Sequence, residues 1–299
     1  MKKNSVKILF ASRAKESAPR EGGFVVLTDI ARKLSNSKTG FSPFMFSTNH
    51  KTSDNIGTEC IYSDIGWNRK LRLEFFLGLY RKAHFYDIVH TAHIPTKLNT
   101  HLIKFAIKKA RKSGTLFVQT ITGLPATNIN QEELKKLIWG DHIVCQSEGT
   151  YKKVRKLISS SQSCSLITPW RPDDIIQFDK GRRIETRKKL FVGYKHIVIF
   201  PGEFDRLGVD VKFRECIKSF FENSKDSLVV FACRFDKKGT GQIIASEFPH
   251  QVKSLGSTDN IIPLLEASDL VIYPVRTMDH KFQPPLVILE ALQLKSKVL

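Results

Sequence analysis

Short apolar runs alternate with amphipathic stretches along the chain, and this alternation predicts its secondary structure. In the first half, strands are expected at residues 6–11, 41–48, 58–62, 87–90, 116–120, 141–146 and 166–169. Apolar residues at helical spacing predict helices between them, at residues 24–34, 67–83, 98–106 and 151–158. Strands that alternate with helices indicate a doubly wound parallel sheet over residues 1–170.

A second alternation begins further along the chain. Residues 171–194 are rich in charge and poor in apolar pattern, so we expect them to form a crossing between two domains. Beyond the crossing, strands are expected at residues 196–200, 228–232, 252–256 and 270–273. Helices are expected at residues 211–220 and 261–267 and from Pro285 onward. The sequence therefore predicts an α/β protein of two Rossmann-like, doubly wound domains, at residues 1–170 and 195–299.

Charge narrows the range of partners. The chain has 48 Lys and Arg residues against 29 Asp and Glu residues, a net charge of +19 that favours nucleic acid, anionic lipid or phosphorylated substrates. No nucleic-acid motif accompanies this charge, so nucleic acid is not the expected partner. Basic residues flank the predicted helix at 67–83, which either lies on an anionic membrane surface or covers the sheet.

Cysteine usage and hydropathy bear on the compartment. Five cysteines are widely scattered with no C-x-x-C pair, which argues against a disulfide framework or a zinc site and for a reducing compartment. The first residues lack the apolar core of a signal peptide, and no run approaches the ~20 apolar residues of a membrane span. We expect a cytoplasmic protein whose contact with the inner face of a membrane, if any, is peripheral.

Two stretches have the pattern of phosphate sites. Gly22 and Gly23 lie between the first strand and a helix, where glycine lets backbone N–H groups approach a ligand, although most such pairs are ordinary turns. Near the end of the chain, Pro285 suits the first position of a helix, and the N-terminus of that helix favours a phosphate. One turn further, Glu290 can accept hydrogen bonds from sugar hydroxyls. The alternative is a core helix with one exposed Glu.

Two Rossmann-like halves with these loops resemble the GT-B glycosyltransferases of family 4, which are retaining enzymes that use nucleotide-sugar donors. The resemblance covers nearly the whole chain, and its most specific parts are residues 87–90, 141–150, 252–273 and 285–291. It implies a donor, UDP- or GDP-linked, in the cleft between the domains, and no metal or other cofactor. Glu290 matches the residue that holds the ribose. Pro285, Leu286 and Val287 match the turn whose backbone N–H groups face the diphosphate.

The first domain supplies further matches. Gly22 and Gly23 match the loop that closes over the diphosphate. The family's His-x-His is one residue longer here, from His90 to His93, which makes His93 a candidate catalytic residue. A solvent-facing loop histidine is the alternative for His93.

The chain departs from the family at several positions. The family's G-R-L…K-G loop begins here at Gly202, where Glu203 replaces the Arg and Arg206 is the cation expected to balance the leaving diphosphate. Phe282 stands where the first Glu of the E-x7-E motif is expected to touch the transferred sugar. The second domain is expected to be incomplete at its C-terminus, by roughly 60 residues at ~30 per βαβ unit.

The sequence thus predicts a retaining, metal-independent glycosyltransferase. Its expected substrates are a nucleotide diphosphate sugar and a glycan acceptor that is lipid-linked or lies at a membrane surface. One alternative is a glycosyltransferase-like binding or scaffold subunit that has lost catalysis, which Phe282, Glu203 and the early end favour. The other is a basic nucleic-acid-binding protein, which charge alone supports.

Overall fold

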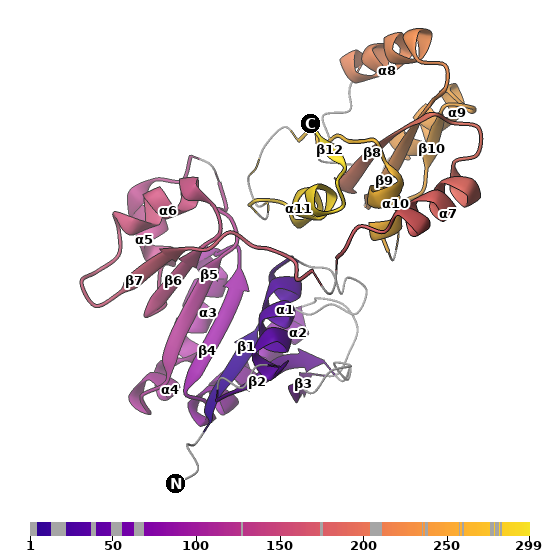
Figure 1. Cartoon of the computed structure of the whole chain (residues 1–299). Coiled ribbons are helices and arrows are strands. Elements are labelled where there is room, and N and C mark those ends of the chain that lie inside the picture. The colour runs from indigo at the N-terminus through magenta and orange to yellow at the C-terminus, as the bar shows by residue number, and fades with distance from the viewer. Residues whose placement is uncertain are drawn as a thin grey trace. The chain divides into compact units, whose positions relative to one another are not determined.

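The computed structural model describes residues 5–12, 22–36, 40–48, 56–62, 69–126, 128–173, 176–203, 211–234, 236, 239–256, 258, 260–275, 278, 281 and 283–299. The chain forms two compact units (Figure 1). The first unit comprises Met1–Trp170 and Met278–Pro284, and the second comprises Arg171–Thr277 and Pro285–Leu299. Each unit is an α/β structure built on a parallel sheet, as the sequence predicts.

Within its described residues, the first unit contains a seven-stranded parallel sheet in the order β3-β2-β1-β4-β5-β6-β7. The strands are β1 Val6–Ala11, β2 Phe41–Thr48, β3 Gly57–Tyr62, β4 Ile88–His93, β5 Leu116–Ile121, β6 His142–Cys145 and β7 Ser163–Leu166. From β1 the chain first winds outward through β2 and β3, then returns to β4 on the other side. The switch point therefore lies between β1 and β4, where open α/β sheets bind ligands at the carboxyl ends of their strands.

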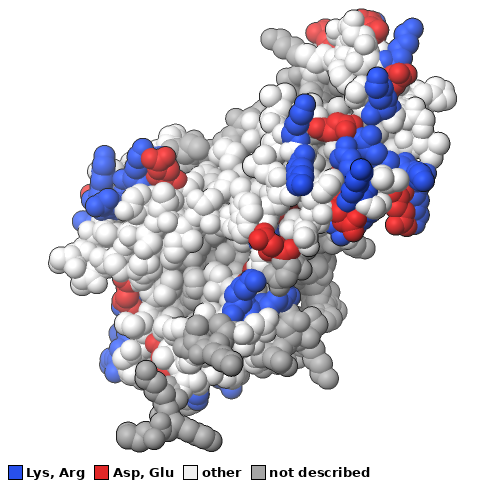
Figure 2. Space-filling model, viewed as in Figure 1, with Lys and Arg blue, Asp and Glu red and all other residues white. Residues whose placement is uncertain are grey.

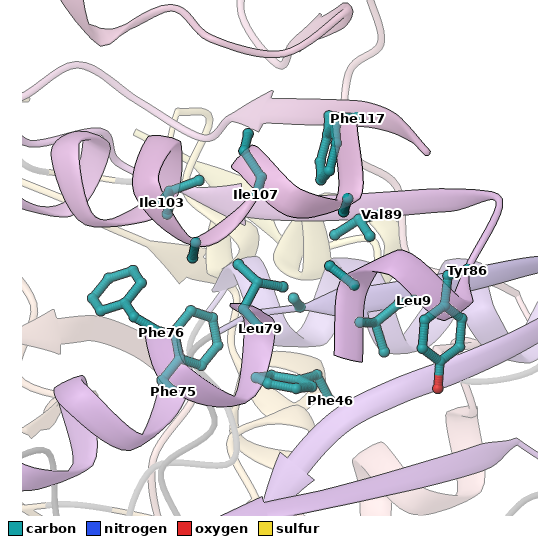
Figure 3. Packing of buried hydrophobic residues seen from close by; sticks show 14 of the residues in the cluster. Leu9, Phe46, Phe75, Phe76, Leu79, Tyr86, Val89, Ile103, Ile107 and Phe117 are labelled. Carbon is teal, nitrogen blue, oxygen red and sulfur yellow. The ribbon is translucent and has the colours of Figure 1, made fainter. Parts of the chain in front are cut away.

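Helices cover both faces of this sheet. They are α1 Gly22–Asn36, α2 Arg69–Lys82, α3 Lys97–Ala106, α4 Lys108–Lys112, α5 Gln131–Leu137 and α6 Glu148–Arg155, with a short 3-10 helix η1 Ala83–Phe85. On one face, Leu79 of α2 and Ile103 of α3 pack with Leu9 of β1 (Figure 3). On the other face, Leu27 of α1 packs against Phe10. Because side chains alternate along a strand, the adjacent residues Leu9 and Phe10 pack against helices on opposite faces of the sheet.

Polar caps fix where several helices begin. Side-chain oxygens of Thr96, Asn130 and Ser147 accept hydrogen bonds from backbone N–H groups in the first turns of α3, α5 and α6, at 3.3, 2.8 and 3.4 Å. With Ser147 as its cap, α6 begins at Glu148, so the expected start at residue 151 is wrong by three residues.

The last strand of the first sheet lies earlier than expected. β7 spans Ser163–Leu166 instead of residues 166–169, because Ser163 pairs with His142 of β6 and the ladder runs from there. This strand forms the edge of the sheet and is polar and only half-buried, so it has no apolar run to reveal it.

Within its described residues, the second unit holds a five-stranded parallel sheet in the order β10-β9-β8-β11-β12. The strands are β8 His196–Glu203, β9 Ser227–Arg234, β10 Val252–Ser254, β11 Leu270–Val271 and β12 Lys297–Val298. The helices are α7 Lys180–Leu190, α8 Val211–Asn223, α9 Thr240–Glu247, α10 Ile262–Ala267 and α11 Leu286–Gln293. The switch point lies between β8 and β11, and the expectation of two Rossmann-like halves is confirmed.

The expected crossing at residues 171–194 contains a helix that the apolar pattern does not reveal. α7 is held by ionic contacts to α10 and to the turn that follows it: Arg182 binds Glu266 of α10 through two guanidinium nitrogens, and Arg183 binds Asp269 in the turn at 2.7 Å. Figure 2 shows cations and carboxylates interspersed over this part of the second unit. Helix assignment from apolar spacing fails for α7 because polar groups carry its contacts.

None of the helices in the described part of the chain is long and apolar enough to cross a membrane.

Candidate functional site

In the first unit, α1 begins at the switch point of the sheet. Gly22 and Gly23 are the first two residues of α1, so the expectation that they form a loop before the helix is wrong. A Cβ atom on Gly23 would lie 2.6 Å from the carbonyl oxygen of Ala92 in β4, which is closer than real Cβ contacts. The hydroxyl of Ser12, next to the end of β1, donates to the same carbonyl at 3.1 Å. Glycine at position 23 therefore allows the first turn of α1 to touch the sheet edge.

His93 lies at this same edge. It is the last residue of β4, pairs in register with Ile121 of β5 and is half-buried, so the alternative of a solvent-facing loop histidine is wrong. Its ring stacks on Trp139, with 6.4 Å between ring centroids and 19° between ring planes. The strand and the indole together fix the orientation of the imidazole. A catalytic role for His93 stays a prediction.

His90 has a different environment. It lies in the middle of β4, away from the carboxyl end, and its Nε2 is 2.7 Å from the hydroxyl oxygen of Thr120. Burial, with a smaller contribution from His142, lowers the pKa of His90 from 6.5 to about 4. His90 is therefore neutral at physiological pH, and its side chain contacts Thr120 of the neighbouring strand within the sheet. Of the two histidines that the sequence singles out, His93 alone lies at the carboxyl edge.

The lowered pKa of His90 predicts a pH-dependent stability. Because the unfolded chain binds a proton near pH 6.5 and the folded chain only near pH 4, stability should fall as the pH drops through this range, by at most about 3 kcal/mol. We expect the variant His90→Gln, which can still bond to Thr120 but does not titrate, to lose less stability over the same range. Urea unfolding of both proteins at pH 7 and pH 4.5 measures this difference, and equal losses would contradict the assignment.

The loop after β5 is covered by a segment from far along the chain. The N–H of Gln283 donates to the carbonyl of Thr122 at 2.7 Å. A Cβ atom on Gly123 would lie 1.9 Å from the carbonyl oxygen of Lys281, so this approach requires glycine at position 123. Met278–Pro284 therefore packs on the first unit. Phe282, the position of the absent sugar-contacting Glu, lies outside the described residues.

In the second unit, β8 also ends in a glycine contact. Gly202 has φ of +120°, a conformation that favours glycine, and a Cβ atom there would lie 3.0 Å from the ring of Tyr273. Gly202 thus lies at the carboxyl end of β8, beside the switch point with β11. Arg206, the expected diphosphate cation, lies outside the described residues, and its role stays a prediction.

The helix expected near the end of the chain is α11. Pro285 is its N-cap, with φ of −58° and ψ of 128°, and Leu286 is its first residue, so the expectation that Pro285 opens the helix is wrong by one position. The N–H groups of Leu286 and Val287 lie in the first turn, where a helix offers no internal acceptor. This end of α11 has the donors and the positive dipole that suit an anion.

Glu290 is buried in the second unit. Only 8% of its surface is exposed, so the alternative of a core helix with an exposed Glu is wrong. Its Oε1 accepts a hydrogen bond from Nη1 of Arg171 at 2.5 Å, and the backbone carbonyl of Arg171 accepts one from the side chain of Gln293 at 2.8 Å. The guanidinium balances the carboxylate and orients it. Arg171 is absent from the residues that the sequence singled out, since 119 positions separate it from Glu290.

No protein-family model and no curated protein matches the sequence. Solved structures do match. The chain is similar to HepE from Anabaena in complex with UDP and glucose (TM-score 0.70, 15% identity, 98% of this chain and 80% of that chain). It is also similar to sucrose-phosphate synthase from Thermosynechococcus elongatus (TM-score 0.69, 14% identity, 98% of this chain and 80% of that chain).

A third match is a putative UDP-N-acetylglucosamine 2-epimerase from Listeria monocytogenes (TM-score 0.57, 10% identity, 98% of this chain and 78% of that chain). At these identities the likeness concerns the fold. Together with the two parallel sheets, these matches show that the chain has the GT-B fold of nucleotide-sugar-dependent glycosyltransferases.

Proposed function

We propose that the protein is a glycosyltransferase that uses a nucleotide diphosphate sugar as donor. The observation that carries the proposal is the buried Glu290, oriented by Arg171 within two turns of the N-terminus of α11. A carboxylate forms strong hydrogen bonds with hydroxyl donors, and a ribose presents two of them side by side. The N–H groups at Leu286 and Val287 provide donors for the diphosphate. The structures of HepE with UDP and with UDP-glucose support this choice of ligand.

The finer features of the proposed reaction rest on the residues that match the family resemblance. In the proposed enzyme, Arg206 and the N-terminus of α11 stabilise the negative charge that develops on the leaving diphosphate, so no metal is required. Gly22, Gly23 and Gly202 are further proposed donor-binding residues, the first two through their backbone N–H groups. His93 acts at the transferred sugar, whose anomeric configuration is retained. The proposed acceptor is a glycan that is lipid-linked or lies at a membrane surface.

Titration calorimetry of the full chain with UDP and with GDP tests donor binding. We expect one of the two to bind, and absence of binding to both would overturn the proposal. Turnover is tested separately, by incubating the chain with UDP- and GDP-linked sugars and following release of the nucleotide. Release of UDP or GDP with retained configuration in the sugar product supports the transferase.

A binding subunit without catalysis is the second candidate, and two sequence positions favour it. Phe282 and Glu203 replace residues that the family uses at the transferred sugar and the diphosphate. Binding of UDP or GDP without cleavage of any donor would support this candidate. Conversion of the bound sugar nucleotide into its epimer would instead indicate an epimerase, an activity that also occurs on this fold.

A further inference from the structure

The helices on one face of the first sheet are apolar on two sides. Their inner sides carry buried residues such as Phe75, Leu79 and Ile103, which pack on the sheet (Figure 3). Their outer sides carry a second set of large apolar side chains, with exposed fractions from 38% to 65%. These are Leu73, Leu77 and Tyr80 of α2 and Leu98 and Phe105 of α3. A helix that only covers a sheet is polar on its outer side. This second apolar set therefore indicates an interaction site.

The outer apolar residues form one patch. Leu73, Leu77 and Tyr80 recur at helical spacing and share one side of α2, and Leu98 and Phe105 lie two turns apart on one side of α3. The rings of Tyr80 and Phe105 stack across the two helices, with 5.9 Å between centroids and 12° between planes. We name these five residues the α2/α3 surface.

Cations accompany this surface, with almost no carboxylates. Residues 69–85 and 97–112 contain eleven Lys or Arg residues and a single acidic residue, Glu74. Exposed lysines continue the line of Leu98 and Phe105 along α4, at positions Lys108, Lys109 and Lys112. Lys97 and Arg111 pair with Glu133 and Asp141 of neighbouring segments, and the remaining nine cations face a single carboxylate within these ranges. The α2/α3 surface thus combines exposed aromatic and aliphatic groups with a positive border.

We infer that the α2/α3 surface docks the protein on an anionic lipid bilayer. The apolar side chains would enter the boundary between headgroups and acyl chains, and the lysines would remain at the level of the lipid phosphates. Tyr80 suits this boundary because its ring is apolar and its hydroxyl is polar. The apolar patch therefore matches the acyl chains of a bilayer, and the positive border matches its anionic headgroups.

Other partners match the α2/α3 surface less well. A second copy of the chain would bring two borders of the same positive charge together, which is unfavourable. Single-stranded nucleic acid binds through aromatic faces that are open to stacking, whereas Tyr80 and Phe105 stack on each other.

This inference deepens the proposed function and rests on it in one respect only. A first unit bound to a bilayer would bring a transferase to an acceptor carried by a lipid. Docking itself requires no catalysis, so membrane binding and donor binding can be tested apart.

Sedimentation of the full chain with lipid vesicles tests the inference. We expect binding to vesicles that contain phosphatidylglycerol, weaker binding at high salt, and little binding to vesicles of phosphatidylcholine alone. The triple variant Lys108→Gln, Lys109→Gln, Lys112→Gln should lower the partition coefficient about a hundredfold, since each lysine near the surface contributes about a fivefold factor. The double variant Leu77→Ser, Phe105→Ser should lower it at least about tenfold.

Matched variants in the second unit serve as controls. Lys180→Gln, Lys188→Gln, Lys189→Gln removes three exposed charges from α7, and Val192→Ser with Ile243→Ser removes two exposed apolar groups. Both should sediment as the wild-type chain does. Equal binding by all variants, or equal losses in test and control variants, would overturn the inference.

Two further outcomes would also overturn the inference. In both, the wild-type chain does not bind vesicles. In the first, it forms a dimer in solution that the test variants abolish. In the second, it shifts a nucleic acid in a salt-sensitive manner, and the test variants abolish that shift. UDP affinity of each variant, measured without lipid, reports on the donor site alone. Loss of vesicle binding with unchanged UDP affinity therefore separates failure of docking from failure of the proposed function.

Discussion

Replacing Glu290 by Gln is expected to weaken UDP binding by one to two orders of magnitude, because hydrogen bonds to a charged group contribute about 1.5–3 kcal/mol. The amide has nearly the shape of the carboxylate and can still approach Arg171. It lacks the negative charge that makes the carboxylate a strong acceptor for two ribose hydroxyls. Calorimetric titration of the variant with UDP, or with GDP if the wild-type chain selects it, measures the loss.

Folding must be separated from binding in this experiment. Glu290 and Arg171 form a buried ion pair, so removing one charge also destabilises the second unit. Thermal unfolding of Glu290→Gln establishes a temperature at which the variant is fully folded, and titration is done there. Glu247→Gln makes the same chemical change in an exposed pair with Arg214 and should leave UDP affinity unchanged. Unchanged affinity in a folded Glu290→Gln protein would remove Glu290 from the donor site.

The central strands could be predicted from the sequence because they are buried on both faces. β1 and β8 contain continuous apolar runs, at residues 8–11 and 197–200, which is the pattern of strands in the middle of a parallel sheet. Elements at the periphery could not be predicted from the apolar pattern. β7 is a polar edge strand, and α7 is held by arginines. The pattern did not predict α9 for a related reason. The start of α9 is fixed by the carboxylate of Asp236, which accepts hydrogen bonds from two backbone N–H groups at 2.8 Å.

The candidate site was predictable where one residue type is required by local chemistry. Gly23 stands out as a glycine between the first strand and a helix, and Gly202 as a glycine at a strand end; the structure gives each a close contact, with Ala92 and Tyr273 respectively. Glu290 stands out as a carboxylate in an apolar helix. Its partner Arg171 does not, because the chain has many cations and none of their patterns indicates which one meets Glu290. Pairings between distant residues depend on the assembled sheet, which a single sequence does not specify.

Replacing Arg182 by Met is expected to destabilise the second unit by about 2–3 kcal/mol. Glu266 has no exposed surface, and its two oxygens are held by Nε and Nη2 of Arg182 and by the N–H of Asp179. Met keeps the apolar stem of Arg182 but leaves the carboxylate buried without its counter-charge. Breaking a fully buried pair costs about 3–5 kcal/mol, and 39% exposure of the Arg182 side chain reduces this because water reaches the guanidinium.

The measurement must be local because two units make a single global unfolding transition an unsafe assumption. Hydrogen exchange of peptides from α7 and α10, followed with urea unfolding, reports on the contact itself. The exposed Lys188, changed to Met on the same helix, is the matched control and should shift stability by less than about 0.5 kcal/mol. The double variant Arg182→Met, Glu266→Gln should recover part of the loss, since it removes the stranded charge. If Arg182→Met and Lys188→Met are equally stable, the ionic contacts do not hold α7, and the helix must be held by weaker packing instead.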